Sequence, residues 1–465
     1  MISPTCLLLL VAALAAPSQI PLHAGSAAPL VMVGSARVDI TPELPIRLSG
    51  YGARQAEATR VEMPLFARAL AIGAENPVVL ITVEVVGISE SLGDAVAAAL
   101  REQHGIPRAK VAIAVTHVHT GPSLAGVLPN LFSADLPSDE VARIDAYTER
   151  LRGLLIEVAN SALAVRKPGA LSWAEGTVGF ATQRRQIVDG KWTGFTHSPD
   201  GPVDHSLPVL RVTDERGGVR AVLLNYACHC TTLQAADNYV HSDWAGDAAR
   251  RIESAHPGSV ALVAIGCGAD GNPNPRGSAD LVTAHGGKIA GEVERLLAQE
   301  WRSLGPVTAA AYKRIELAFE RTPTREELVA RTGGEQKQSI RYAASKFLER
   351  LDAGQPLPRG VTYPIQTWIF GGNLAMVFLS GEVVSEYSLR LRSELDGARL
   401  WVNAYSNSVP CYVASKRMFS EGGYEVDGSM DYYGWPGRLA LGTEDQIIRT
   451  VHEMIPPSFR RRSAH

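Results

Sequence analysis

The chain has 465 residues, of which 46% are hydrophobic and 20% are charged, and this composition is typical of a soluble globular protein. Its 45 basic and 48 acidic residues give a formal net charge of −3 without a long basic block, which argues against a nucleic-acid-binding surface. The length allows one large domain or about two to three smaller ones.

An apolar run from Cys6 to about Ala16 opens the chain, and small residues follow it. The run is shorter than the roughly 20 apolar residues that a membrane-spanning helix needs. We therefore expect residues 1–26 to be a secretory signal peptide, although no Lys or Arg precedes the run, and we expect the protein to be secreted or periplasmic. The alternative is that this segment is not a targeting signal.

Strand and helix patterns alternate after residue 31. Near-continuous Val, Ile and Leu indicate buried strands at 77–86, 111–119, 221–229, 260–266 and 373–381. Helical patterns lie at 91–105, 148–169, 244–256 and 286–301. The expected fold is α/β or mixed α+β, with mixed sheets covered by helices. We expect one domain over 31–455, with the polar, helical residues 320–358 as a surface insertion.

The cysteines leave two alternatives open. Four remain if Cys6 is removed with the signal peptide, namely Cys228, Cys230, Cys267 and Cys411. They show no loop-stapling pattern, so they are either buried small hydrophobic residues or members of one or two disulfides.

Polar residues recur where the predicted strands end, which is where α/β folds place their functional sites. These residues are Thr116-His117-Val118-His119, Cys228-His229-Cys230, Asp270-Gly271-Asn272 and Gly381-Glu382. A catalytic zinc ion takes about three His or carboxylate ligands and leaves one position for water. On a strand, His117 and His119 point to one face, so both would approach a metal, or one would bind it and the other would carry protons.

Each of these signals has a structural alternative. A His-x-His pair is not rare by chance in a chain with 12 histidines, and His229 also fits the pattern of an ordinary core histidine. Cys228 and Cys230 would lie on the strand face opposite His229, which disfavours a mixed thiolate site. Glu382 suits the first turn of a helix. The chain also lacks the GxSxG, GxxxxGK[ST] and GxGxxG motifs, so serine-hydrolase, P-loop and dinucleotide-binding functions lack support.

Taken in order, the motifs resemble the neutral/alkaline (non-lysosomal) ceramidase family over about residues 33–450. The motifs are VGSARVDITPE (33–43), LSGYGAR (48–54), MPLFARALAI (63–72), THVHTGP (116–122), CHCTTL (228–233), HSDWAGD (241–247), GADGNPNPRG (268–277), SGEVVSEYSLRLR (380–392), NSVPCYVASKRMF (407–419) and EGGYE (421–425).

The resemblance implies one catalytic zinc ion and hydrolysis of the amide bond of ceramide to a sphingoid base and a fatty acid. The implied zinc ligands are His117, His229, Glu382 and Tyr412. The implied catalytic residues that line the site are His119, Tyr424 and Arg184.

The implied chemistry is attack of a zinc-bound water on an amide carbonyl. Zinc lowers the pKa of bound water from 15.7 toward about 7. Zinc, His119 and Tyr424 would stabilise the oxyanion, and His119 would carry a proton to the leaving amine.

The chain departs from the family pattern in two places. Asn272 stands where the family has a serine, which disfavours a serine nucleophile and leaves the zinc mechanism intact. We also expect no C-terminal immunoglobulin-like domain, and the sequence shows no apolar loop that would contact a membrane. The alternatives to a lipid amide hydrolase are therefore a zinc hydrolase of small soluble amides or esters, and a metal-dependent binding protein without turnover.

Overall fold

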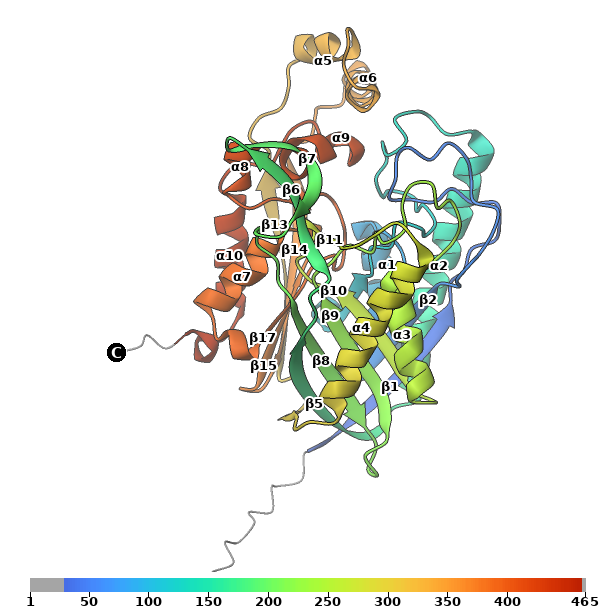
Figure 1. The fold of residues 1–465 in the computed structure, drawn as a ribbon, viewed down its shortest axis with the longest axis vertical. Helices are drawn as coiled ribbons and strands as arrows, with labels where there is room; N and C mark the ends of the chain where they lie inside the picture. The colour runs from blue at the N-terminus through green and yellow to red at the C-terminus, as the bar shows by residue number, and fades with distance from the viewer. Residues whose placement is uncertain (1–28, 462–465) are drawn as a thin grey trace, which may run out of the picture.

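Two mixed β-sheets form the centre of the computed structural model, which describes residues 29–461 (Figure 1). The predicted signal peptide lies outside the described residues. The larger sheet has the strand order β10 (Val260–Ile265), β9 (Val219–Tyr226), β8 (Ser206–Thr213), β5 (Lys167–Thr177), β1 (Leu30–Asp39), β2 (Phe66–Ile72), β3 (Val78–Val83) and β4 (Val111–Val115), with β12 (Arg302–Leu304) paired to β5. The smaller sheet has the order β13 (Ala309–Ala318), β14 (Gly360–Phe370), β15 (Leu374–Leu379) and β17 (Leu400–Asn403).

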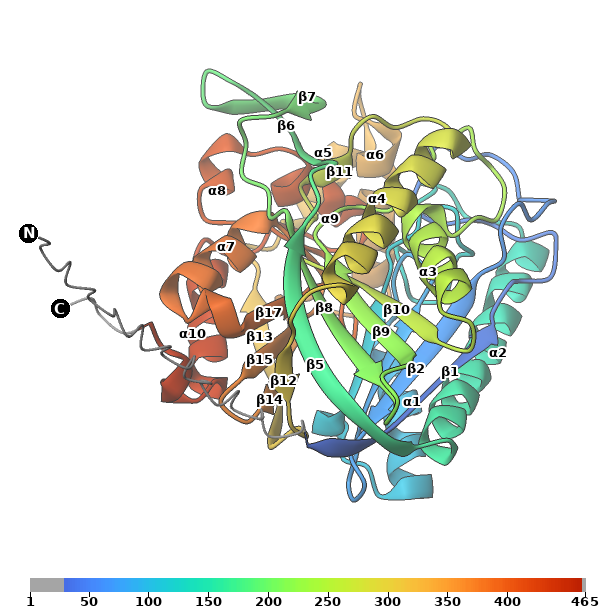
Figure 2. The ribbon, with the colours of Figure 1, turned by 60° about the horizontal axis from the view of Figure 1, so that its bottom comes forward.

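The two sheets pack face to face and are covered by helices on their outer sides (Figure 2). The larger sheet is covered by α1 (Glu90–His104), α2 (Ser138–Ala164), α3 (Asp243–Ala255) and α4 (Ala279–Leu297), and the smaller sheet by α7 (Ser385–Glu394) and α10 (Thr443–Met454). Side chains alternate between these layers. On β2, Leu70 contributes to the core between the sheets, whereas Ala69 and Ala71 pack on the helical side. Because both faces are buried, such strands appear as unbroken apolar runs.

The remaining elements are short or lie at the periphery. Two further small sheets contain β11 (Gly271–Pro273), β6 (Ala181–Val188) and β7 (Lys191–Ser198), and β16 (Glu382–Val383) with β18 (Tyr412–Val413). The remaining helices are α5 (Arg325–Thr332), α6 (Gln338–Asp352), α8 (Met418–Glu421) and α9 (Ser429–Tyr432). A π-helical turn lies at Tyr424–Gly428, and 3-10 turns lie at Arg108–Lys110, Gly397–Arg399 and Pro457–Phe459. Within residues 29–461, no helix is long and apolar enough to cross a membrane.

The predicted fold class is confirmed, and the element boundaries need corrections. Helix α2 begins at Ser138 and ends at Ala164, whereas 148–169 was expected, because the polar first turn with Asp139 and Glu140 shows no apolar periodicity. Helix α4 begins at Ala279 because the Ser278 side chain caps it by accepting from the Leu281 amide. The polar residues 320–358 contain α5 and α6, which lie between β13 and β14.

All four cysteines of the described chain are buried free thiols: Cys228, Cys230, Cys267 and Cys411.

The loops that follow distant strands are tied together by backbone hydrogen bonds. The amide of His119, after β4, donates to the carbonyl of Cys230, after β9, at 3.3 Å. The segment after β17 joins the same region, since the Val115 amide donates to Tyr405 O at 3.1 Å. Strands β4 and β10 stand at opposite ends of the strand order, yet they lie beside each other because the sheet curls. This curl brings the loops of both sheets to one place.

A buried ion-pair network fixes β2, β3 and α3 beneath these loops. The Arg68 guanidinium contacts Glu84 Oε1 at 2.5 Å and Glu253 Oε1 at 3.0 Å, and all three side chains are buried. Replacing Arg68 by Met (Arg68→Met) leaves the buried carboxylate of Glu84 without its ion-pair partner and removes one of the two arginines that pair with Glu253, so we expect the free energy of unfolding to fall by about 3–5 kcal/mol. Chemical denaturation measures this loss.

Arg37→Ala is the matched control, because Arg37 also pairs with Glu253 but its side chain is 51% exposed. That variant should lose only about 0–1 kcal/mol. Equal losses in the two variants would show that the buried network does not stabilise the fold as described.

Candidate metal centre

Two histidines, one glutamate and one tyrosine from four separate segments converge above the curled sheet. His117 lies after β4, His229 lies after β9, and Glu382 and Tyr412 are the first residues of β16 and β18. Glu382 Oε2 lies 3.1 Å from Nε2 of His117 and 3.2 Å from Nε2 of His229. The Tyr412 hydroxyl lies 3.3 Å from the same His229 nitrogen. The structure thus brings the four predicted metal ligands together.

The His-x-His pair reaches this place through a turn and not along a strand. Strand β4 ends at Val115, two residues earlier than the first histidine, and His117 has a positive φ of 54°. The expectation that strand alternation aims His117 and His119 at one face is therefore wrong. A left-handed backbone conformation is unfavourable for a residue with a side chain and is often found at functional sites. It turns His117 back toward His119, so that their Nε2 atoms are 3.0 Å apart.

Two short strands set Glu382 and Tyr412 side by side. Strand β16 pairs in parallel with β18, and Glu382 is the direct partner of Tyr412 in the register. Gly381 precedes the glutamate with a φ of 76°, and a β-carbon there would lie 2.7 Å from the carbonyl oxygen of Cys411. Only glycine fits this close approach in a left-handed conformation. Gly381 thus forms a tight turn that places the Glu382 carboxylate beside Tyr412. Glu382 is not in the first turn of a helix, contrary to the structural alternative given above.

Backbone carbonyls fix the tautomers of both ligand histidines. His117 Nδ1 lies 2.6 Å from Val86 O, and His229 Nδ1 lies 2.9 Å from Gly268 O. A carbonyl only accepts hydrogen bonds, so each Nδ1 carries a proton and Nε2 is the ring nitrogen that faces Glu382. Metal-binding histidines are held by their second nitrogen in the same way.

The hydrogen bonding of the Glu382 carboxylate shows whether a cation would fit between the four residues. Its Oε1 accepts a hydrogen bond of 2.5 Å from the Tyr433 hydroxyl. Its buried Oε2 has no hydrogen-bond partner among residues 29–461 and faces the two imidazole nitrogens. Three electron-pair donors therefore meet in one buried place. Two imidazoles, a carboxylate and a phenol oxygen are a donor set that suits Zn²⁺.

Burial and neighbouring charges determine which of these groups carry a proton. Burial, with help from Arg184, lowers the pKa of His229 to about 4, so its imidazole is neutral at neutral pH. Burial also lowers the pKa of His119 well below its usual value, as do His117 and His229.

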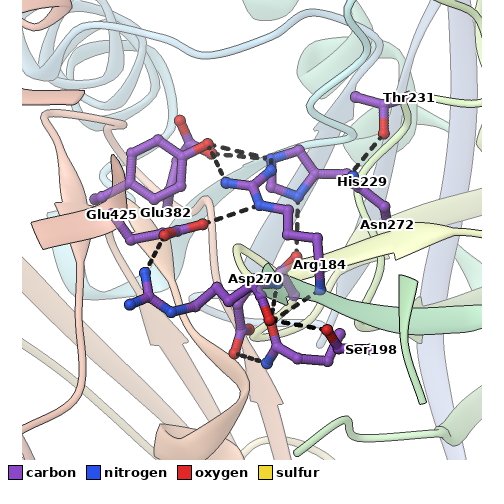
Figure 3. Close-up of polar contacts among 12 residues, drawn as sticks. Arg184, Ser198, His229, Thr231, Asp270, Asn272, Glu382 and Glu425 are labelled. Atoms are coloured by element: carbon purple, nitrogen blue, oxygen red, sulfur yellow. Dashed lines mark hydrogen bonds and ion pairs between the residues drawn. The ribbon is translucent and has the colours of Figure 1, made fainter. Parts of the chain in front are cut away.

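Arg184 lies in β6 and contacts the centre from one side (Figure 3). Its guanidinium lies 3.3 Å from His229 Nε2 and donates to the Tyr412 hydroxyl at 3.1 Å and to Glu425 Oε1 at 3.0 Å. Figure 3 shows it between the His229 imidazole and the Glu425 carboxylate. The Arg184 amide also donates to the carbonyl of Asp270 at 2.9 Å. Buried Arg184 is therefore held from several directions.

The remaining predicted residues lie around the centre. Partly buried His119 packs edge-on against Tyr51, with ring centroids 4.9 Å apart, and its Nδ1 has no hydrogen-bond partner in the described chain. The geometry also groups His119 with the two ligand histidines as a candidate metal-binding set. The Tyr424 ring lies 5.3 Å from the Tyr412 ring. Asn272, at the position of the family's serine, accepts a hydrogen bond of 3.3 Å from Thr231 through its side-chain carbonyl.

Sequence reasoning missed Tyr433 and Glu425, which hold Glu382 and Arg184. Glu425 stands within the EGGYE motif, yet nothing near it in the sequence marks it as a partner of a strand 241 residues away. Tyr433 stands in a run of aromatic residues that is typical of ordinary core packing. Asp270, one of the polar residues expected at a strand end, is not in the donor set: its carboxylate accepts from Gln183 Nε2 at 2.7 Å and from the Ser385 amide at 2.8 Å.

The Tyr433 hydroxyl provides a direct test of how Glu382 is held. Removing it by Tyr433→Phe deletes a buried hydrogen bond to a carboxylate, so we expect a loss of about 1.5–3 kcal/mol in the free energy of unfolding of the metal-free protein. Tyr363→Phe is the matched control, because Tyr363 is fully buried and its hydroxyl has no partner within the described residues. Denaturant titration should show little change for the control. A loss as large as that of Tyr433→Phe would contradict the assignment.

Comparisons with known proteins identify the family and the fold. A family model described as neutral/alkaline non-lysosomal ceramidase, N-terminal, matches residues 31–293. A neutral ceramidase from Pseudomonas aeruginosa has the same fold with a TM-score of 0.68 and 18% sequence identity, covering 94% of this chain and 77% of that chain. A structure described as a ceramidase complexed with C2 has a TM-score of 0.68 and 17% identity, with the same coverage of both chains. No curated protein matches the chain. The chain belongs to the neutral/alkaline non-lysosomal ceramidase family.

Proposed function

We propose that this protein is a zinc-dependent amidohydrolase that cleaves the N-acyl amide bond of ceramide or a ceramide-like lipid. The observation that carries the proposal is the convergence of the His117, His229 and Glu382 donor atoms, in a chain of the ceramidase family. His117, His229, Glu382 and Tyr412 would hold the metal. When bound, zinc supplies Lewis-acid chemistry and lowers the pKa of a water to about 7.

His119 and Tyr424 would handle the proton and the developing charge. Burial raises the pKa of Tyr424 well above its usual value, so the phenol keeps its proton and donates a hydrogen bond to the carbonyl oxygen of the substrate. His119 is neutral in the resting protein, so it accepts a proton and passes it to the leaving amine.

Arg184 would act by positioning. It donates to the Tyr412 hydroxyl and contacts His229, and it is itself held by Glu425. Its positive charge opposes the effect of burial, which raises the pKa of Tyr412, and so favours the phenolate form that a metal ligand needs. We further propose that residues 1–26 direct the protein out of the cytoplasm, to the periplasm or the medium.

Metal removal tests the proposed activity. Purified protein should hydrolyse a fluorescent short-chain ceramide, lose this activity on chelation and regain it with Zn²⁺. His117→Ala should lower turnover at least about 100-fold, because it removes a ligand, whereas Asn272→Ala should lower it less than about tenfold. Product formation is followed by chromatography.

Each other outcome points to a different function. Zinc-bound protein that leaves ceramide untouched but cleaves small soluble amides or esters would contradict the lipid substrate. Zinc binding without any turnover would indicate a binding protein. Equal losses in the His117 and Asn272 variants would contradict the ligand assignment.

Replacing His119 tests whether this residue carries protons or binds the metal. We expect His119→Ala to keep its zinc content and to lose about 10²- to 10⁴-fold in kcat, the usual contribution of general acid–base catalysis. Zinc is measured by elemental analysis of dialysed protein, with His117→Ala as the zinc-free reference. Loss of zinc from His119→Ala would make His119 a ligand, as its 3.0 Å approach to His117 also allows.

A further inference from the structure

A two-stranded hairpin projects away from the main sheets (Figure 2). It consists of β6 and β7, joined by Asp189 and Gly190, both with positive φ. Such a two-residue Asp-Gly turn is favoured between antiparallel strands. Arg184 lies on the first strand, so the hairpin connects the metal centre with the protein surface.

The second strand carries an exposed aromatic side chain. Phe195 is 50% exposed, and it is the one aromatic residue among the large hydrophobic side chains that are exposed in the described part of the chain. Its inner side is fixed, since the Arg184 guanidinium carbon lies 4.9 Å from the centre of its ring. A large aromatic surface in contact with water is unfavourable unless a partner covers it.

Phe195 belongs to a continuous row of aromatic rings that leads to the metal centre. The ring centroids are 5.5 Å apart from Trp192 to Phe195, 5.3 Å from Phe195 to Tyr424 and 5.3 Å from Tyr424 to Tyr412. All three pairs are edge-to-face, which is a favourable geometry for aromatic rings. Tyr412 is buried at the inner end, where its hydroxyl lies 3.3 Å from His229 Nε2. We call Trp192, Phe195 and Tyr424 the aromatic row.

The outer end of the aromatic row is held rigidly. A β-carbon on Gly423 would lie 2.4 Å from Cγ of Trp192, so the indole packs directly on the backbone of that glycine. Gly423 has a φ of 104° and immediately precedes Tyr424. The hairpin and the segment that carries Tyr424 are thereby packed together, and the row keeps its shape without a ligand.

We propose that the aromatic row binds the hydrocarbon chain of the amide substrate next to the scissile bond, with Phe195 as the residue that determines preference for long chains. The inference rests on the proposed function, because it places the amide at the metal centre. It follows from the continuity of the row, in which ring contacts run from exposed Phe195 through partly buried Tyr424 to Tyr412 beside the metal centre, and from the absence of charge on its rings. A methylene chain laid along them would cover the exposed face of Phe195.

The experiment compares matched short and long substrates in wild type and variants. Acetyl and octanoyl amides of one fluorogenic amine vary the acyl side, and methyl and octyl amides of one fluorogenic acid vary the amine side. In one of the two series, Phe195→Ser should lower kcat/KM for the long substrate more than for the short one. The difference should be about tenfold, as expected for the loss of one aromatic contact with the hydrocarbon chain. The change should lie in KM, and Phe195→Leu should restore most of the preference.

Val188→Ser is the control, because Val188 is 48% exposed on the same hairpin but lies outside the aromatic row. It should leave both series unchanged. An equal loss with short and long chains would assign Phe195 a purely structural role through Arg184 and overturn the proposal, as would an equal effect of Val188→Ser.

A binding measurement keeps this proposal separate from the proposed function. A dansyl-labelled octyl amide should bind wild-type protein about tenfold more tightly than Phe195→Ser, as monitored by dansyl fluorescence. If wild-type protein binds this probe more tightly than Phe195→Ser does but cleaves no amide, the proposed function is contradicted and the role of the aromatic row in binding a hydrocarbon chain is supported. If amides are cleaved and neither series nor the probe distinguishes Phe195→Ser, the row is overturned and the hydrolase stands.

Discussion

A buried carboxylate oxygen that has no hydrogen-bond donor among residues 29–461 is the constraint around which this site is built. Glu382 Oε2 faces Nε2 of His117 and of His229, whose other nitrogens are committed to backbone carbonyls. Burying an ionised carboxylate without a compensating partner costs several kcal/mol. A divalent cation turns the same arrangement into a favourable one, because each lone pair becomes a ligand.

The rest of the fold serves to hold that arrangement in place. The curled sheet brings the loops after β4 and β9 together, and a backbone hydrogen bond from His119 to Cys230 joins them. The smaller sheet adds Glu382 through a glycine turn, and Tyr412 through its direct pairing with Glu382. Tyr433 and Arg184 then hold one ligand each from outside the donor set. Because the ligands come from segments up to 295 residues apart in sequence, from His117 to Tyr412, the site forms only when both sheets have packed.

Much of the fold and of the candidate site could be predicted from the sequence, because ligand-type residues stand where the apolar strand patterns end. The apolar runs before His117, His229 and Glu382 identify buried strands, and the fold class follows from their alternation with helices. The order of the motifs then identifies the family. The hairpin β6–β7 was not predicted, since its residues lack strong apolar alternation, although Asp189-Gly190 is a recognised turn signal.

Other features depend on contacts that no local pattern contains. The left-handed backbone of His117 is imposed by the surrounding loops, so the strand-based reason for its direction was wrong although the residue does reach the centre. Tyr433 and Glu425 act on residues 51 and 241 positions away. The aromatic row likewise joins two segments that are remote in sequence. Such partners are visible only when the tertiary structure is known.

The central claim is that the lone pairs of His117, His229 and Glu382 meet at one metal ion. Anomalous diffraction recorded on crystals of the zinc-loaded protein on either side of the zinc absorption edge tests it most directly. The account predicts one strong peak between His117 Nε2, His229 Nε2 and Glu382 Oε2, at about 2.0–2.2 Å from each, with the Tyr412 hydroxyl as a further ligand. Full zinc occupancy at another place, or no peak between these three atoms, would contradict it.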